Sequence, residues 1–247
     1  MQAKDYLKNQ NFNFITKTLH KWRYKLAFDF ILREMEQIQC EETRLHIIDF
    51  GCGTAGFFNF LRKKNLNCGK FNYLGIEVSE EFIDYSNEQY SQDARYSISR
   101  TINLKELNLE SDWDKYIFVS LETFEHLPYT LRIDLVKNLG ERSQLPFLIT
   151  VPNEVGFGLL VKNIGSLIMG YTARFNEYGW RGTYYGMFER LDMLPAHTTY
   201  HRGFDWRALQ YELRQFCKFR TIKRKALGLS LVSLAFVRQR KLVDLKE

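Results

Sequence analysis

The stretch DFGCGTAG, residues 49–56, joins one carboxylate to three glycines where an apolar run ends and a helical pattern begins. Glycines let the backbone turn tightly and approach a ligand, and the following helix N-terminus presents unpaired N–H groups with a partial positive charge. The G-x-G-x-x-G spacing of Gly51, Gly53 and Gly56 is typical of a dinucleotide site, which is one interpretation. Asp49 favours another, because a carboxylate attracts an amino acid's ammonium group and repels a pyrophosphate.

Short apolar runs alternate with amphipathic segments over residues 45–151, a pattern typical of βαβ units and a parallel sheet. The predicted strands are 45–50, 71–77, 95–102, 115–121 and 146–151, and the predicted helices between them are 55–64, 79–90 and 129–140. Right-handed connections bring the carboxyl ends of such strands to one edge, where ligands bind. A helix over 204–219 and two strands around Gly228 then predict a closing hairpin rather than a second mononucleotide half.

This combination resembles the class I S-adenosylmethionine-dependent methyltransferases, whose first motif places an acid two residues before the first glycine. Glu77 ends the second predicted strand, where the family has an acid that accepts both ribose hydroxyls. SLETFEHLP, residues 120–128, is similar to the family segment ending in E-H-L or E-H-V. HRGFDW, residues 201–206, opens a helix as in many small-molecule members. The resemblance covers residues 45–151 and 201–240.

The resemblance implies S-adenosylmethionine as the cofactor and specific residues of this chain as its site. The residues assigned to the cofactor are Asp49, Gly51, Cys52 and Gly53 for the methionine portion, Glu77 for the ribose, Val78 for the adenine edge, and Leu121 and Glu122 beside the sulfonium. We interpret Cys52 as a small filler residue rather than a nucleophile, because its neighbours supply no base.

The implied fold is α/β, a Rossmann-like doubly wound sheet of seven strands in the order 3-2-1-4-5-7-6, with strand 7 antiparallel. Apolar residues at helical intervals predict an N-terminal helical segment over 1–44, followed by a methyltransferase domain over 45–247. Residues 152–203 interrupt the alternation and are rich in glycine and aromatic residues. We predict that they form an insertion after strand 5 that covers the substrate.

Methyl transfer from a sulfonium is a direct displacement, so alignment of acceptor, methyl group and sulfur carries most of the catalysis. A hydroxyl acceptor also benefits from a base that titrates near neutral pH, as histidine does. His201, where the insertion rejoins the core, and His126, after the fourth strand, are the candidates. The sequence has neither the Asn/Asp-Pro-Pro-aromatic motif of N-methyltransferases nor a Pro-Cys nucleophile. The prediction is therefore a hydroxyl acceptor, with a carboxylate or nitrogen as alternatives, and no metal.

The acceptor class rests on the insertion. Residues 151–156, VPNEVG, and the apolar segment after them loosely resemble methyltransferases of polysaccharide and lipid-linked sugar biosynthesis. Aromatic side chains bind sugar rings and apolar ligands, and an apolar pocket is the usual form of a small-molecule site. The candidate substrate-binding residues are Tyr178, Trp180, Tyr184 and Tyr185. The expected acceptor is a small molecule, a glycan or a lipid-linked sugar; the alternative is that these aromatic residues pack the insertion on the sheet.

The net charge of +6 is concentrated in residues 204–247, which carry 11 basic and 4 acidic residues. One alternative is therefore an RNA or protein methyltransferase that docks through basic C-terminal strands. Peripheral contact with an anionic membrane is a further expectation from the same charge. A second alternative is a methyltransferase-like module that binds the cofactor without turnover.

Four scattered cysteines without zinc-ligand spacing indicate a reducing compartment. Residues 1–10 have no apolar region of the kind found in a signal peptide. The longest apolar stretch, 155–171, is too short and too interrupted to span a bilayer. These features predict a cytoplasmic protein without a transmembrane segment.

Overall fold

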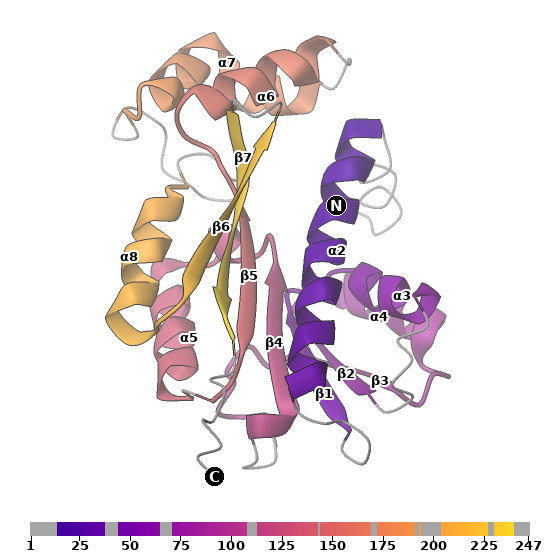
Figure 1. Ribbon diagram of the computed structural model, residues 1–247. Helices are drawn as coiled ribbons and strands as arrows, with labels where there is room; N and C mark the ends of the chain where they lie inside the picture. Colours follow the sequence, from indigo (N-terminus) through magenta and orange to yellow (C-terminus); the bar gives the residue numbers. More distant parts are fainter. Residues whose placement is uncertain are drawn as a thin grey trace.

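The computed structural model describes residues 14–37, 44–64, 71–107, 113–142, 144–168, 172–190, 193, 204–226 and 230–239. Within these residues, a seven-stranded sheet has helices on both faces (Figure 1). The strands are β1 (Leu45–Phe50), β2 (Phe71–Ile76), β3 (Tyr96–Ser99), β4 (Tyr116–Leu121), β5 (Phe147–Pro152), β6 (Arg220–Ala226) and β7 (Ser230–Arg238). The helices are α2 (Phe14–Gln37), α3 (Gly56–Lys63), α4 (Glu80–Tyr90), α5 (Tyr129–Glu141), α6 (Phe157–Ile168), α7 (Thr172–Met187) and α8 (Trp206–Phe216).

The sheet order is β3-β2-β1-β4-β5-β7-β6, as predicted. Strands β1 to β5 pair in parallel, and β7 runs antiparallel to both β5 and β6. The carboxyl ends of β1, β2 and β4 consequently lie at one edge, which brings the loops after these strands together.

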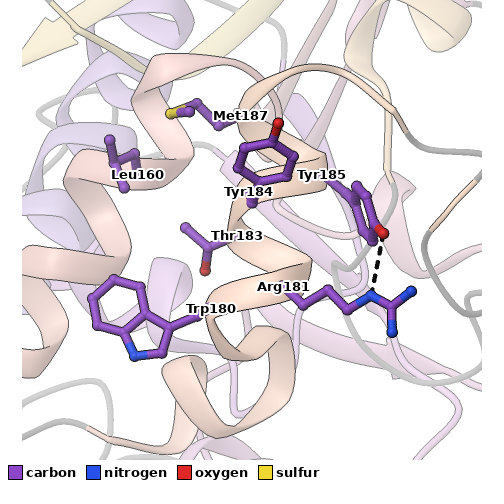
Figure 2. Close-up of a pocket in the computed structure, with 7 residues that line it drawn as sticks. All are labelled: Leu160, Trp180, Arg181, Thr183, Tyr184, Tyr185 and Met187. Carbon is purple, nitrogen blue, oxygen red and sulfur yellow. Dashed lines mark hydrogen bonds between the residues drawn. The ribbon is translucent and has the colours of Figure 1, made fainter.

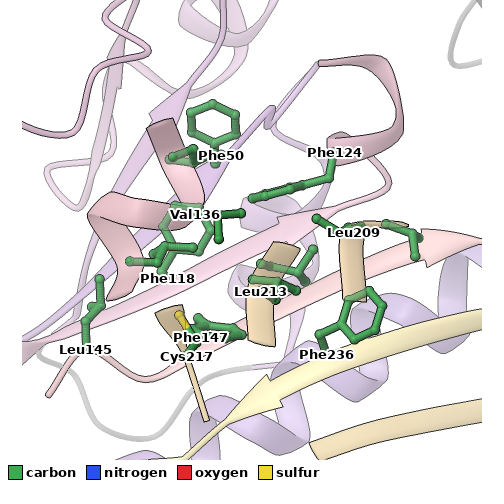
Figure 3. Packing of buried hydrophobic residues seen from close by; sticks show 14 of the residues in the cluster. Phe50, Phe118, Phe124, Val136, Leu145, Phe147, Leu209, Leu213, Cys217 and Phe236 are labelled. Carbon is green, nitrogen blue, oxygen red and sulfur yellow. The ribbon is translucent and has the colours of Figure 1, made fainter. Parts of the chain in front are cut away.

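Alternate residues of the central strands fill two separate hydrophobic clusters, one on each face of the sheet. On one face, Phe118 of β4 and Phe147 of β5 pack with Val136 of α5 and Leu213 of α8 (Figure 3). Successive side chains of a strand point to opposite faces of the sheet, so each central strand contributes to both clusters. Burial on both faces explains the nearly continuous apolar runs in the sequence.

Helix α2 belongs to the opposite cluster, as the helical periodicity of the N-terminal residues suggested. Its side chains Ala27, Phe30 and Ile31 are buried with Phe58 and Leu61 of α3. The packing of α2 therefore places an N-terminal helix beside the loop that follows β1.

The insertion after β5 contains two helices, α6 and α7, that pack on each other at one end of the molecule (Figure 1). The buried Asn163 side chain of α6 donates a hydrogen bond of 2.7 Å to the Thr183 hydroxyl of α7. Gly179 interrupts α7 with a φ of +60°, a conformation that favours glycine, and so bends the helix. The apolar segment that follows VPNEVG thus forms α6, and a second helix follows it.

Arg238 at the end of β7 ties the closing hairpin to the end of α5. Its buried guanidinium donates hydrogen bonds to the carbonyl oxygens of Leu139, Arg142 and Leu145, at 2.7, 2.8 and 2.6 Å. It also lies 4.7 Å from the ring centroid of Phe147. A cation near a helix C-terminus stabilises the unpaired carbonyl groups there, and burial lowers the pKa of this guanidinium.

We predict that Arg238→Met lowers the free energy of unfolding by about 2–4 kcal/mol, because it removes a buried donor that binds three carbonyl groups. Urea denaturation would measure the change. The matched control is Arg220→Met, at an exposed position of β6, which should change stability by no more than about 0.5 kcal/mol. Equal effects at the two positions would contradict this role for Arg238.

None of the described helices is long and apolar enough to cross a membrane.

Candidate functional site

The glycine loop after β1 is held against the ends of two neighbouring strands. The backbone N–H groups of Gly51 and Cys52 both donate to the carbonyl oxygen of Ile76, at 2.8 and 3.1 Å. Gly51 has a φ of +73°, and a Cβ built there would lie 2.2 Å from the side chain of Thr123, in the loop after β4. Residue 51 must therefore be glycine for both conformational and steric reasons.

Glu77 follows β2 and bonds back to the glycine loop. One of its carboxylate oxygens accepts from the backbone N–H of Gly53 at 2.9 Å, and the other accepts from those of Val78 and Ser79 at 2.8 and 2.9 Å. Because an ionised carboxylate has about four lone-pair positions, capacity remains for further donors. The Val78 side chain beside it is 62% exposed, so an apolar surface lies next to an oriented carboxylate.

Asp49, the last but one residue of β1, is a buried carboxyl group. The Tyr73 hydroxyl donates a 2.6 Å hydrogen bond to it, and its side chain is 2% exposed. Burial raises the pKa of Asp49 to about 7, against the smaller lowering effects of the Tyr73 bond and of Arg23. Burial also raises the pKa of Tyr73, which stays protonated and donates. The Asp49 carboxyl group therefore ionises near neutral pH, and a cation bound beside it would favour the ionised form.

Cys52 is a buried thiol between these two carboxylates. Burial raises its pKa well above the ordinary value, with Asp49 and Glu77 contributing in the same direction. Because the thiolate is the nucleophilic form, this environment disfavours a nucleophilic role.

Arg23 of α2 is a site residue that the sequence analysis missed. Its guanidinium, 4% exposed, forms an ion pair with Glu122, directly after β4. Glu122 has a φ of +58°, so its backbone is in the left-handed region that non-glycine residues rarely adopt. The pairing of these residues brings a buried positive charge from the N-terminal helix to the glycine-loop edge of the sheet.

Of the three remaining predicted site residues, the structure describes Leu121 and His126. Leu121 is the last residue of β4 and packs against the cluster that includes α2, while His126 ends the 3-10 turn η2 (Phe124–His126) and is exposed. His201 lies outside the described residues. The described part of the chain holds no group of three His, Cys, Asp or Glu side chains arranged for a metal ion.

The predicted substrate-binding aromatic residues lie on α7, apart from the glycine loop. Trp180, Tyr184 and Tyr185 line a cavity of about 480 Å³ between α7 and α6, and the Tyr185 hydroxyl accepts a 3.2 Å hydrogen bond from Arg181 (Figure 2). Trp180 is 65% exposed and Tyr184 57%, so these two are not packed into the sheet core. The side chain of Tyr178 is outside the described part.

Similar solved structures are methyltransferases. Magnesium protoporphyrin IX methyltransferase from Synechocystis PCC 6803, with bound SAH, aligns with a TM-score of 0.54 at 15% identity, over 92% of this chain and 88% of that one. DszA carbon methyltransferase aligns with a TM-score of 0.59 at 10% identity, over 98% of this chain and 61% of that one. The chain has the class I methyltransferase fold. Small RNA methyltransferase HEN1 aligns at 0.53 and 14% identity, where 90% of this chain spans only 25% of HEN1.

No protein-family model and no curated protein matches the sequence. The likeness to the methyltransferases is therefore one of fold, and the chemistry has to be argued from the side chains of this chain.

The raised pKa of Asp49 makes a prediction about stability and pH. Between pH 3.8 and about 7 the folded protein keeps a proton that the unfolded chain has lost. The free energy of unfolding should therefore fall as pH rises through this window, by on the order of 3 kcal/mol from this group. Asp49→Asn removes the titration, so its stability relative to wild type should improve by that amount from pH 4 to 7.

Urea denaturation at a series of pH values would measure this difference. The matched control is Asp84→Asn, the same change at an exposed position of α4, measured over the same pH series. A constant difference for Asp49→Asn would show that burial does not hold the Asp49 proton.

Proposed function

We propose that the protein is an S-adenosylmethionine-dependent methyltransferase that moves a methyl group to a hydroxyl of a small-molecule, glycan or lipid-linked acceptor. The observation that carries the proposal is the pair of carboxylates, Asp49 and Glu77, on either side of a glycine loop at the carboxyl edge of a methyltransferase fold. A carboxylate or nitrogen acceptor is the less favoured form of the same proposal.

The site residues fit the two ends of this cofactor. Asp49 would bind the ammonium of the methionine portion, and the buried guanidinium of Arg23 would bind its carboxylate. Glu77 would accept hydrogen bonds from the ribose hydroxyls, and the exposed Val78 side chain would contact the adenine. When bound, the cofactor supplies an electrophilic methyl group on a sulfonium. Cys52 contributes its backbone and a small neutral side chain.

Catalysis in this proposal is mainly positioning, because direct displacement requires alignment above all. Leu121 ends β4 and Glu122 follows it beside the glycine loop, and both would flank the sulfonium. His126, exposed after β4, or His201 would accept the proton from an acceptor hydroxyl. Asp49 is held by Tyr73 and Glu77 by backbone donors, so both are oriented before a ligand arrives.

The proposal treats residues 45–247 as the methyltransferase domain, 1–44 as a helical segment that closes its cofactor edge, and 152–203 as a cover over the acceptor. The aromatic cavity between α6 and α7 supports an acceptor with a sugar ring or an apolar part. We place the protein in the cytoplasm, because Cys52 and Cys217 are free thiols and reduced cysteines are typical there.

A second candidate function is methylation of RNA. It is favoured by the exposed basic residues Arg220 and Lys223 on the edge strand β6, and small RNA is the substrate class named for HEN1, which shares the fold. RNA binding through phosphates weakens steeply with salt, whereas binding of an uncharged acceptor does not. The salt dependence of acceptor binding therefore separates the two functions.

Calorimetry with S-adenosylhomocysteine, the demethylated cofactor (SAH), tests cofactor binding. We predict binding by wild type, and affinities about 10- to 100-fold lower for Glu77→Ala and Asp49→Asn, because each loses a charge-assisted contact. Glu88→Ala, which removes an exposed carboxylate of α4, is the matched control and should bind like wild type. Absence of binding by wild type, or equal binding by all four proteins, would refute the proposal.

The role of Arg23 is tested by comparing SAH with adenosine, which lacks the amino acid portion. Arg23→Met should weaken SAH binding by about tenfold or more and leave adenosine binding unchanged, because only SAH has a carboxylate. Glu77→Ala should weaken both ligands. The double variant Arg23→Met/Glu122→Gln removes the ion pair as a whole, and it should behave as the single variant does. If Arg23→Met lowered the affinities for SAH and adenosine equally, Arg23 would support the fold and would not bind the carboxylate.

A further inference from the structure

Large apolar side chains gather on the exposed surface of the insertion. Those between 40% and 65% exposed within residues 157–190 are Phe157, Ile164, Trp180, Tyr184 and Phe188. Single exposed apolar residues are common on proteins, but a group from one pair of helices indicates an interaction surface. We call these five residues the α6–α7 apolar surface.

This surface is presented by an ordered helix pair. Asn163 and Thr183 are hydrogen-bonded in the interface between α6 and α7, and a Cβ at Gly186 would lie 2.4 Å from Leu159, so the two backbones approach closely. The Tyr184 ring lies 4.8 Å from that of Phe188, measured between centroids. The contacts between the two helices therefore hold these exposed side chains at the surface of an ordered unit.

The sequence that contains this surface is basic. Residues 157–190 carry four basic and two acidic residues, and one of the acids, Glu189, is bound to Arg207 at 2.6 Å. Arg181, next to Trp180, is exposed and donates to the Tyr185 hydroxyl. Residues 223–225, Lys-Arg-Lys in sequence, lie in the half of β6 that runs toward α6 (Figure 1). An anionic partner with an apolar interior fits both features.

We propose that the α6–α7 apolar surface docks on the interface of a lipid bilayer that contains anionic lipids. Trp and Tyr side chains place an apolar body among acyl chains and a polar tip among headgroups, and arginine binds phosphate there. Anionic lipids attract the basic residues that flank the surface. A second copy of the chain fits less well, because it would bring two positive surfaces together. RNA fits less well because it offers no apolar interior for Ile164 and Phe157.

This inference rests on the proposed function and deepens it, since it selects the lipid-linked class of acceptor. A methyltransferase held at the bilayer surface by the helix pair over its acceptor side would meet a lipid-linked sugar without extracting it from the membrane. The aromatic cavity between α6 and α7 would then face the headgroup region.

Co-sedimentation of the full chain with vesicles tests the inference. Vesicles of phosphatidylcholine with about one third phosphatidylserine should bind the wild-type protein, and pure phosphatidylcholine should bind it less. Trp180→Ser/Phe188→Ser should lower binding to the anionic vesicles by on the order of tenfold or more. Arg181→Glu should lower binding to anionic vesicles and leave binding to neutral ones unchanged. The tryptophan emission should shift to shorter wavelength on binding in wild type, and this shift should be lost in Trp180→Ser/Phe188→Ser.

The matched control is Tyr211→Ser, which removes a 68% exposed aromatic side chain of α8 and should bind vesicles like wild type. SAH calorimetry on the same samples separates the two proposals, because docking variants should keep SAH affinity and cofactor-site variants should keep vesicle binding. Equal vesicle binding by wild type and Trp180→Ser/Phe188→Ser would overturn the inference. An absence of wild-type binding to the anionic vesicles would overturn it as well. Salt-sensitive RNA binding, or self-association that Trp180→Ser abolishes, would then identify the other occupant.

Discussion

Negative charge collected at one edge of a parallel sheet is the constraint on which the site depends. Asp49 lies one residue before the end of β1, and Glu77 and Glu122 directly follow β2 and β4. The parallel strands bring these positions together. Partly buried carboxylates are costly unless they are paired, hydrogen-bonded or protonated. Each of the three has a different solution here: a raised pKa for Asp49, backbone donors for Glu77, and the Arg23 guanidinium for Glu122.

The pairing of Arg23 with Glu122 connects the N-terminal helix to the candidate site. Helix α2 packs on the sheet through Ala27 and Ile31, and the same helix turns Arg23 toward the carboxylate edge. A zwitterionic amino acid would complement the pair of Asp49 and Arg23, one charge for each end. In the proposed function, the packing of α2 and the binding of the cofactor therefore depend on each other.

Several strands and helices could be predicted because the residue patterns that produce them are local in the sequence. The strand at 45–50 and the helix at 129–141 follow from apolar residues at periods of 2 and 3.6. The predicted boundaries of these two elements agree with the structure to within one residue. Residues 172–187 had no clear pattern, because Gly179 bends α7 and shifts the phase of its apolar face. The glycine loop and the acid that follows β2 were recognisable because a tight turn requires glycine and a carboxylate at a strand end requires Asp or Glu.

Periodicity was enough to predict the sheet, the family resemblance gave its strand order, and residue types placed Asp49 and Glu77 at the carboxyl edge of the sheet. The three-dimensional structure was needed to show that Arg23 meets Glu122, 99 residues away, that Asp49 is protonated up to about pH 7, and that Trp180 and Tyr184 face outward. The physical reason is that residue type and periodicity act over a few neighbouring residues. Charge pairing, desolvation and exposure depend instead on which distant segments the fold brings together.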